Sequence, residues 1–274
     1  MSQVVIIGAG WLGKPLAQAL LADGHHVSAT KTSIDGVNSL QECGIPAFVC
    51  DLAKPEFLEE DLRQRDCEIV IGCFPPRFRH GNTDDYVHYW ASVVTHARTA
   101  GVKKIMMVSS TSVYPAAEGT MVESDASYAQ SLSSDMFTDN AKRLLQAEQC
   151  VIDSGLDYTI VRCSGLIGPD RHPSRFVAHL SAISDQAPAN MIHQTDAVGV
   201  LRYAATHISK EVLNATTPDT VNKAQFYQEA LKQANLNTSF PPITHTGDKR
   251  VSAEKLLGLG YDFHYKSTLD AITL

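Results

Sequence analysis

Short apolar runs alternate along this chain with segments whose apolar residues recur at helical spacing. The runs typical of buried strands are 4–7, 26–30, 47–50, 69–71, 105–108, 158–162 and 212–215. Apolar residues at i, i+3 and i+4 predict a helix after the first run, with Leu12, Leu16 and Leu20 on one face. The same spacing predicts further helices at 33–43, 55–65, 85–100, 135–153, 195–207, about 220–234 and 252–258. This alternation predicts a parallel sheet covered by helices on both faces.

The most informative segment is the turn that follows the first apolar run. Val4–Ile7 is continuous and apolar, as a buried parallel strand is, and 8–13 reads Gly-Ala-Gly-Trp-Leu-Gly. In a G-x-G-x-x-G motif between strand and helix, Gly8 permits the tight turn, Gly10 lets the backbone approach a diphosphate, and Gly13 allows close helix packing. The helix N-terminus then offers free N–H groups to the anion. The alternative is a glycine-rich turn in another kind of α/β protein, because the motif alone is weak evidence and its context carries the prediction.

The predicted fold class is therefore α/β, a Rossmann-type doubly wound parallel sheet with a small C-terminal substrate-binding region. Residues 1–165 are expected to form the NAD(P)-binding domain, with returning elements near 195–215. Residues 166–274 are expected to form the smaller, interleaved substrate-binding region. Within it, 165–195 is expected to be rich in loops and 235–250 looks loop-like.

Composition narrows the class of protein further. The 274 residues are 44% hydrophobic and 19% charged, with a formal net charge of -7 and no basic cluster, so nucleic acid is an unexpected partner. No apolar stretch approaches membrane-spanning length, and the chain begins almost at once with a core strand, without room for a signal peptide. The six cysteines are scattered and the eleven histidines lack metal-ligand spacing, so we expect no metal. A cytoplasmic location follows from this pattern.

Several later segments, in order, resemble motifs of one enzyme family. The segments that are similar to motifs of the extended short-chain dehydrogenases are Ser-Ser-Thr-Ser-Val-Tyr at 109–114, the Arg-to-Gly-Pro stretch at 161–169, Ile-His with Asp at 192–196, Asn214, and Lys-Leu-Leu with Gly-Tyr at 255–261. This is the NAD-dependent epimerase/dehydratase family, and the resemblance covers nearly the whole chain. Trp-Leu-Gly at 11–13 and Gly-x-x-Arg-His-Pro at 168–173 are most similar to its YeeZ-like atypical subgroup.

The resemblance implies a catalytic apparatus that this sequence carries only in part. In the family, a Tyr-x-x-x-Lys on one helix face transfers the proton and holds the ribose. Here the best-placed lysine is Lys142, and Thr138 stands at the tyrosine position. A threonine hydroxyl titrates far above neutrality, so it is no general base. The asparagine of this network is also missing, and Tyr86 stands there. Ser110 matches the catalytic serine and would orient substrate; the alternative is a hydroxyl that caps a strand end.

Two loop tyrosines and several polar groups remain candidates. Tyr114 and Tyr128 could replace the tyrosine, although packing is the more ordinary fate of such side chains. Lys142 could bind the ribose or be a solvated helix lysine. Cofactor contacts are predicted at Gly8, Gly10, Trp11, Leu12, Gly13, Lys31, Asp51 and Cys73.

The cofactor prediction favours NADP over NAD. Lys31 ends the second strand, where NAD-preferring members carry an acid, and a lysine with Thr30, Thr32 and Ser33 would attract a 2′-phosphate. Asp51 resembles the residue that contacts adenine in the family, the alternative being a helix cap.

Basic residues in two loops point to the substrate. Arg77, Arg79, Arg171, His172 and Arg175 belong to loops expected to overhang the carboxyl ends of the strands, where open α/β sheets bind their substrates. They predict a small polar, anionic substrate, unless they are ordinary solvated side chains. His193 also matches a family position, while Asp196 is expected to be a structural carboxylate at a helix start.

Three functions remain open at this point. The first is an NAD(P)-dependent oxidoreductase or epimerase acting on a small molecule. The second is a catalytically inactive dinucleotide-binding sensor or scaffold, suggested by Thr138. The third is an interaction module that uses helices 85–100 and 135–153, where short-chain enzymes dimerise, so that a monomer or homodimer is expected.

Overall fold

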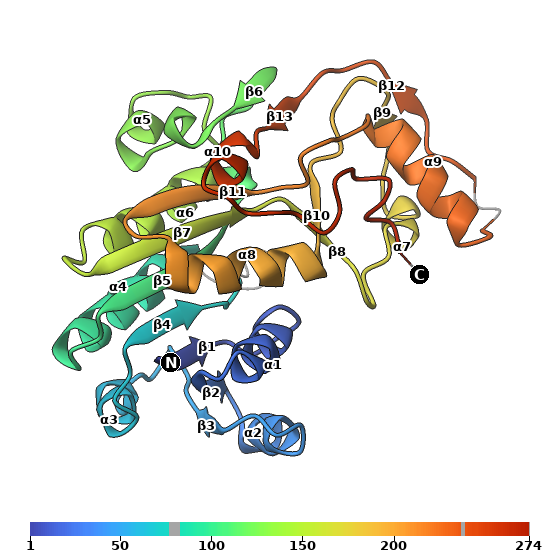
Figure 1. Ribbon diagram of the computed structural model, residues 1–274. Helices are drawn as coiled ribbons and strands as arrows, with labels where there is room; N and C mark the ends of the chain where they lie inside the picture. The colour runs from blue at the N-terminus through green and yellow to red at the C-terminus, as the bar shows by residue number, and fades with distance from the viewer. Residues whose placement is uncertain (77–82, 237–238, 274) are drawn as a thin grey trace.

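The computed structural model describes residues 1–76, 83–236 and 239–273, and its centre is one parallel sheet (Figure 1). The seven strands lie in the order β11-β7-β5-β4-β1-β2-β3. Their bounds are β1 (Gln3–Ile7), β2 (His26–Lys31), β3 (Ala47–Val49), β4 (Ile69–Gly72), β5 (Lys104–Ser110), β7 (Asp157–Cys163) and β11 (Glu211–Ala215). Chain order runs outward in both directions from the β1–β4 pair, which is the doubly wound arrangement. The seven predicted strands and the predicted fold class are confirmed.

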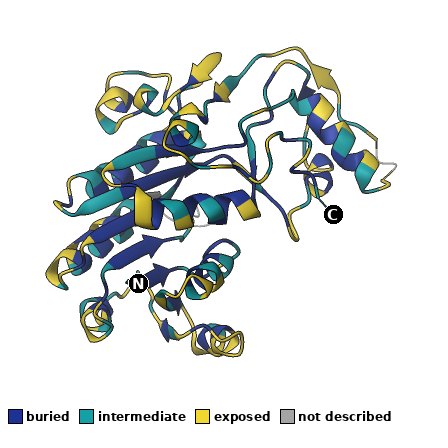
Figure 2. Cartoon of the chain, in the orientation of Figure 1, coloured by how far each residue is buried: buried dark blue, intermediate teal, exposed yellow. Residues whose placement is uncertain are grey.

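Helices cover both faces of the sheet (Figure 1). Those on one face are α1 (Gly13–Ala22), α2 (Ile34–Gln41) and α8 (Gln194–His207), and those on the other are α3 (Leu58–Gln64), α4 (Thr83–Thr99) and α6 (Asp139–Ile152). Alternate strand residues belong to two separate hydrophobic cores, one on each face of the sheet. Ile6 belongs to the core with α1 and α8, whereas Val5 belongs to the core with α4 and α6. The central strands β1, β4 and β5 are accordingly buried on both faces (Figure 2), as their apolar runs predict.

The end of β4 is shaped by a single large side chain. Trp90 of α4 is fully buried, and a Cβ built on Gly72 would lie 2.2 Å from its ring. Phe74 stacks on the Trp90 ring with a centroid separation of 4.8 Å. Gly72 is therefore the residue that lets the α4 indole reach the sheet beside the carboxyl end of β4.

The C-terminal part joins short strands from distant points of the chain. The pairs are β8 (Gly165–Ile167) with β10 (Met191–His193), β6 (Gly119–Met121) with β13 (Lys249–Val251), and β9 (Ile183–Ser184) with β12 (Ile243–Thr244). The helices here are α5 (Tyr128–Leu132), α7 (Ser174–Val177), α9 (Lys223–Gln233) and α10 (Glu254–Gly258). The prediction that 235–250 is loop-like is wrong at 243–244 and 249–250, because strands of two or three residues leave no periodic pattern. A third buried cluster around Phe226 and Val177 holds part of this region together.

Candidate cofactor and active site

The glycine-rich turn lies at the carboxyl end of β1, and its three glycines have different roles. Gly8 has φ +91°, and a Cβ there would come within 3.0 Å of the Phe74 nitrogen. A Cβ on Gly13 would lie 2.5 Å from the Gly8 carbonyl oxygen, so α1 packs against the turn too closely for any side chain. A Cβ on Gly10 would meet nothing within 4 Å. Gly8 and Gly13 therefore shape the turn, whereas Gly10 leaves space open above it.

That space is faced by backbone donors of the first turn of α1. In the part of the chain that the structure describes, the N–H groups of Trp11, Leu12 and Gly13 have no acceptor. Leu12, the N-cap residue, offers no side-chain oxygen to them. Unsatisfied N–H groups and the positive end of the helix dipole favour an anion at this point. The residues present therefore fit the diphosphate of a dinucleotide.

Thr30 anchors the turn from the neighbouring strand. Its hydroxyl oxygen accepts a hydrogen bond from the Gly8 N–H at 3.0 Å, and its carbonyl oxygen accepts one from the Ala9 N–H at 3.0 Å. Its side chain is 1% exposed. The prediction that Thr30 helps to attract a 2′-phosphate is therefore wrong, because its hydroxyl faces the glycine turn inside the fold.

Lys31, the last residue of β2, lies along the first turn of α2. A Cβ on Gly36 would lie 3.0 Å from both Cβ and Cγ of Lys31, so the glycine makes room for the lysine stem. Ser33 caps α2 by accepting a hydrogen bond from the Gly36 N–H at 3.3 Å. Lys31 and the N-terminus of α2 thus lie side by side beyond the carboxyl end of β2, where both favour negative charge.

The two other predicted cofactor residues lie on either side of the turn. The exposed Asp51 follows β3 by two residues and accepts a hydrogen bond from the Ala53 N–H at 3.0 Å, so it closes a local turn. Cys73 lies behind the glycines: its Cβ is 3.3 Å from the position of a Cβ on Gly13, and its N–H bonds to the Ile7 carbonyl oxygen. Burial raises the pKa of the Cys73 thiol, so it stays neutral and packs as a small apolar group.

Ser110 ends β5 at the same edge of the sheet. Its hydroxyl oxygen accepts hydrogen bonds from the Ser112 N–H at 3.1 Å and from the Ser112 hydroxyl at 2.9 Å. The side chain is half-buried, and its proton has no acceptor among the described residues. Ser110 therefore caps the turn at 111–113 and can still donate a hydrogen bond. Ser109 points to the other face of the sheet and donates to Glu148 at 2.6 Å.

The start of α6 shows what Thr138 does. Its hydroxyl oxygen accepts a hydrogen bond from the Ala141 N–H at 3.1 Å, so Thr138 is the N-cap of the helix. The helix predicted from 135 consequently begins at Asp139. Lys142 lies in its first turn and is half-buried. Thr138 is thus a helix cap, and Lys142 is carried on the segment that this cap fixes.

Tyr114 belongs to a buried polar network. Its hydroxyl donates to Asn214 at 2.7 Å and accepts from the Arg162 guanidinium at 3.2 Å. Arg162 also pairs with Glu148 at 2.7 Å, and each of these two charged side chains is 2% exposed. Burial raises the pKa of Tyr114 to about 12, although Arg162 and Asn214 lower it in part. Tyr114 is therefore a packed, hydrogen-bonded side chain; Tyr128 is half-buried and packs against the α4–α6 core.

An aromatic cluster lies at the position where the family's asparagine is expected. Tyr86 is 1% exposed, with its ring 6.5 Å from that of Trp90 and 5.8 Å from that of Phe74, edge to face in both pairs. Burial raises the pKa of Tyr86 above its ordinary value. The cluster fills the region between α4 and the end of β4 with apolar surface, next to Gly8.

The basic loop at 168–175 lies against the glycine-rich turn. The Arg171 guanidinium carbon is 4.3 Å from the centroid of the Trp11 ring, over its face. Arg175 donates to the Asp170 carbonyl oxygen at 2.8 Å. The Nδ1 atom of His172 contacts the Ser174 hydroxyl at 2.8 Å, and burial lowers the pKa of this imidazole. The predicted residues Arg77 and Arg79 lie outside the described residues.

His193 and Asp196 both lie at the start of α8. His193 is 5% exposed; its Nδ1 accepts from the Thr195 N–H at 3.1 Å, and its Nε2 lies 3.2 Å from the Thr273 hydroxyl. Asp196 is fully buried and accepts from the His264 and Tyr265 N–H groups at 2.7 and 3.0 Å. The prediction that Asp196 is a structural carboxylate is confirmed: it ties the C-terminal segment to α8.

Sequence reasoning missed two contacts of the site: the hydrogen bond between Thr30 and Gly8, and the one between Gln194 and Trp11. The polar Thr30 inside an apolar run was a usable signal for its bond to Gly8. The side chain of Gln194 donates to the Trp11 carbonyl oxygen at 2.7 Å, and no feature of the sequence indicates that contact.

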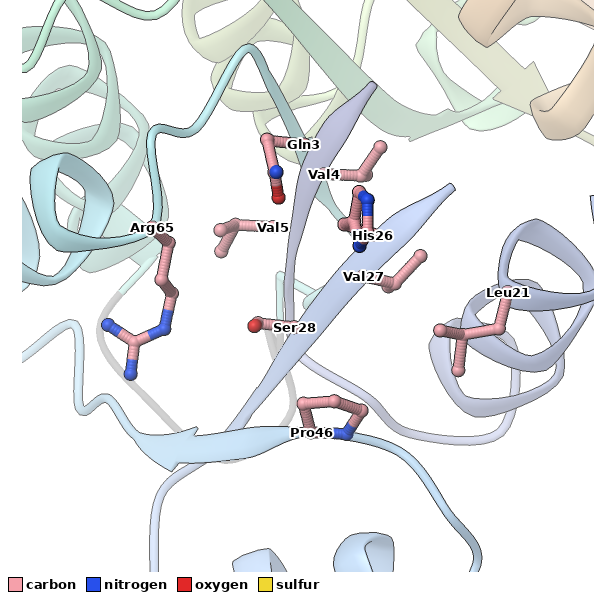
Figure 3. Close-up of a pocket in the computed structure, with 9 residues that line it drawn as sticks. All are labelled: Gln3, Val4, Val5, Leu21, His26, Val27, Ser28, Pro46 and Arg65. Atoms are coloured by element: carbon pink, nitrogen blue, oxygen red, sulfur yellow. The ribbon is translucent and has the colours of Figure 1, made fainter. Parts of the chain in front are cut away.

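A hollow of about 220 Å³ lies away from these residues (Figure 3). It is lined by the first residues of β1 and β2, with Leu21, Pro46 and Arg65 at its sides. Those strand ends are the opposite ends from the glycine-rich turn, so the hollow is separate from the candidate site. Over the ranges 1–76, 83–236 and 239–273, no helix has both the length and the apolar character to cross a membrane, and no three His, Cys, Asp or Glu residues are grouped to hold a metal ion.

Comparison with known proteins agrees with the arrangement at the glycine-rich turn. The model of a family described as NAD(P)H-binding matches residues 8–207. Protein YeeZ of Escherichia coli K12 is 32% identical over 206 residues, which are 73% of this chain and 72% of that protein.

Solved structures share the fold at low sequence identity. The dTDP-glucose 4,6-dehydratase of Bacillus anthracis, solved with NAD, has a TM-score of 0.78 at 14% identity over 99% of this chain and 95% of that one. The UDP-glucose 4-epimerase of Thermus thermophilus, also solved with NAD, has a TM-score of 0.77 at 15% identity over 98% of this chain and 97% of that one. The fold is that of the epimerases and dehydratases.

Proposed function

The chain belongs to the NAD(P)H-binding family, and on that premise we propose that it is an NAD(P)-dependent oxidoreductase or epimerase of the extended short-chain dehydrogenase type. The observation that carries this proposal is the glycine-rich turn, where open space above Gly10 meets the unsatisfied N–H groups of Trp11, Leu12 and Gly13. This combination suits a diphosphate and has no evident structural purpose of its own.

NADP is the favoured cofactor of this proposal. Lys31 and the N-terminus of α2 are the positive groups beyond the end of β2, and a 2′-phosphate there would gain a charge-assisted hydrogen bond. Gly36 supports the preference because it lets the lysine stem lie along the helix. Asp51 would contact the adenine, and Cys73 would pack behind the turn.

The reacting end of the site is assigned to the carboxyl end of β5. Ser110 would donate its free proton to a substrate oxygen, and Lys142 would hold the nicotinamide ribose. The nicotinamide would carry the hydride. The substrate is a small polar molecule with negative charge, because Arg171, His172 and Arg175 lie in one loop at this edge, with His193 fixing the start of α8 behind them.

A second candidate function has its own supporting observation. Thr138, at the tyrosine position implied by the resemblance, is engaged as a helix cap, and Tyr114 is held in a buried network. Both side chains therefore lack the freedom that proton transfer requires. They favour a catalytically inactive sensor or scaffold that binds a dinucleotide without turnover.

Calorimetric titration with NADH and NADPH side by side tests the proposal. We expect heat of binding with both, and a tighter dissociation constant for NADPH. No heat from either reduced cofactor would overturn the proposed function. A crystal soaked with NADPH and a substrate mimic then separates the two candidates: an ionisable side chain within hydrogen-bond reach of the mimic supports an enzyme, and only Thr138 and solvent there supports a sensor.

The proposal also includes the location, the partners and the oligomeric state of the protein. They are a cytoplasmic location, small molecules rather than nucleic acid or membrane as partners, and a monomer or homodimer. The net charge of -7 supports the exclusion of nucleic acid.

A further inference from the structure

The glycine-rich turn is clamped by a segment from the other half of the chain. The Trp11 indole N–H donates to the Pro169 carbonyl oxygen at 2.8 Å, across 158 residues of sequence. Gln194 donates to the Trp11 carbonyl oxygen at 2.7 Å. Arg171 stacks its guanidinium over the Trp11 ring at 4.3 Å. Trp11 is therefore held through both its backbone and its side chain. Its N–H is the first of the three unsatisfied donors, those of Trp11, Leu12 and Gly13, that form the anion cradle.

The side chain of Arg171 is held by an aromatic ring and by no carboxylate among the described residues. Arg63, Arg65, Arg162 and Arg202 each pair with a carboxylate. Arg171 has no acidic partner among the described residues, and its position is fixed by the indole face instead. A stacked guanidinium keeps its N–H groups at the ring's edge, where they remain available to an anion.

We infer that Arg171 is a ligand of the cofactor's diphosphate, held in place by Trp11. A diphosphate carries two negative charges, and the three N–H groups of the cradle are neutral donors. Arg171 is the cation stacked on Trp11, one of the residues of that cradle, and a guanidinium can bind two phosphate oxygens at once. This inference rests on the proposed function and moves Arg171 from the substrate to the cofactor.

Binding of the diphosphate by Arg171 would couple cofactor binding to the substrate loop. Arg171 belongs to the loop that follows β8, and His172 and Arg175 of the same loop are candidates for substrate binding. A diphosphate bound to Arg171 would hold this loop down on the cofactor. Cofactor binding would then preorganise the substrate side of the site.

Titration of Arg171→Leu with NADPH and with ADP-ribose, which contains the diphosphate but no nicotinamide, tests the inference. Loss of a bidentate charged contact should weaken both ligands by roughly tenfold or more. Arg171→Lys, which keeps the charge but not the fork, should fall between Arg171→Leu and the wild type. Arg250→Leu is the matched control: it removes the same charge from an exposed arginine of β13 that has no part in the candidate site, and should change the affinity for both ligands less than twofold.

A double-mutant cycle with Trp11→Leu tests the role of the indole. Because Trp11 acts by holding Arg171, the double variant should bind ADP-ribose no more weakly than Arg171→Leu alone. Arg171 is exposed, so thermal unfolding of Arg171→Leu should match the wild type. If the wild type binds NADPH and Arg171→Leu binds within twofold of it, or loses no more affinity than Arg250→Leu, the inference is wrong and the proposed function stands. If the wild type binds neither ligand, both are wrong.

Discussion

Two corners of the fold contribute to the candidate site in different ways. One is formed by β1, α1 and β2, and the other by β5 and α6. The first is made of backbone: Gly8 and Gly13 are excluded from carrying side chains by contacts within 3.0 Å, and the donors are N–H groups. The second is made of side chains, chiefly Ser110 and Lys142. Its helix is capped by Thr138, at the position where the family resemblance implies a tyrosine.

The difference indicates how a fold can keep its cofactor-binding backbone while the side chains that carry the chemistry change. Backbone geometry at the glycines is coupled to the packing of α1 on β1, so altering it disturbs the fold. At α6, the hydroxyl of Thr138 supplies a cap that keeps the helix in place, whatever chemistry the position performs. Side-chain chemistry can therefore drift at β5–α6 while the cofactor corner stays the same.

The largest effect is expected from Gly10→Val at the backbone corner. The valine would fit the protein, because nothing lies within 4 Å of the added Cβ, but its methyl groups would fill the space assigned to the diphosphate. Affinity for NADPH should fall more than roughly 100-fold, since the cofactor loses its backbone contacts. Calorimetry measures this loss, and thermal unfolding should show an unchanged fold.

Gly258→Val is the matched control for that variant. Gly258, at the end of α10, also has open space around its Cβ position and no positive φ. It should bind NADPH like the wild type. Unchanged NADPH binding by a folded Gly10→Val protein would contradict the site itself.

Lys31→Asp addresses the side-chain part of the same corner. The carboxylate would repel a 2′-phosphate and could accept the ribose hydroxyl, so the ratio of NADPH to NADH affinity should fall by roughly 10- to 100-fold. Parallel titrations with the two cofactors measure the ratio. Lys232→Asp in α9 makes the same charge change far along the chain and should leave the ratio unchanged. A constant ratio in Lys31→Asp would show that another group selects the cofactor.

The sequence predicted the sheet and the glycine-rich turn because both depend on neighbouring residues. Most strands of the sheet contain a run of apolar residues, and the long helices carry periodic apolar faces. The turn is contained within 8–13, directly after its strand. These features need no knowledge of distant contacts.

The contacts made across the chain could not be predicted in the same way. Trp11 meets Pro169, and Gln194 meets Trp11, only after the whole sheet has assembled. Thr30 looked available for a phosphate because sequence alone does not show which face of β2 its hydroxyl takes. The start of α6 was placed early because Thr138 was considered for its chemistry and not as a cap.

Thr138→Ala tests the structural role of the side-chain corner. Removing the cap should lower the free energy of unfolding by about 1 kcal/mol, because the Ala141 N–H loses its acceptor. Chemical denaturation measures the change, and Thr138→Ser should restore most of it. NADPH affinity should stay within twofold of the wild type. A large loss of affinity without a loss of stability would instead place this hydroxyl at the cofactor.

The smallest effect is expected at His193, at the start of α8. Burial lowers the pKa of this imidazole below its ordinary value of 6.5, although Asp196 acts in the opposite direction. The unfolded chain therefore binds the proton more readily than the native one, so stability is fully present above about pH 6.5 and falls as the pH drops below it. The slope due to one group is at most about 1.4 kcal/mol per pH unit.

His193→Asn should remove that part of the slope while keeping the N-cap of α8, because an asparagine oxygen can accept the Thr195 N–H in place of Nδ1. The measurement is the free energy of unfolding by urea between pH 7.5 and pH 5 (about the range over which a free imidazole titrates). His88→Asn, in the exposed face of α4, gives the effect of removing an imidazole that lies in solvent. If His193→Asn and the wild type lose stability in parallel, the acid sensitivity arises elsewhere. If His193→Asn also loses NADPH affinity, the start of α8 and its neighbour Gln194 are part of what holds Trp11 ready for the cofactor.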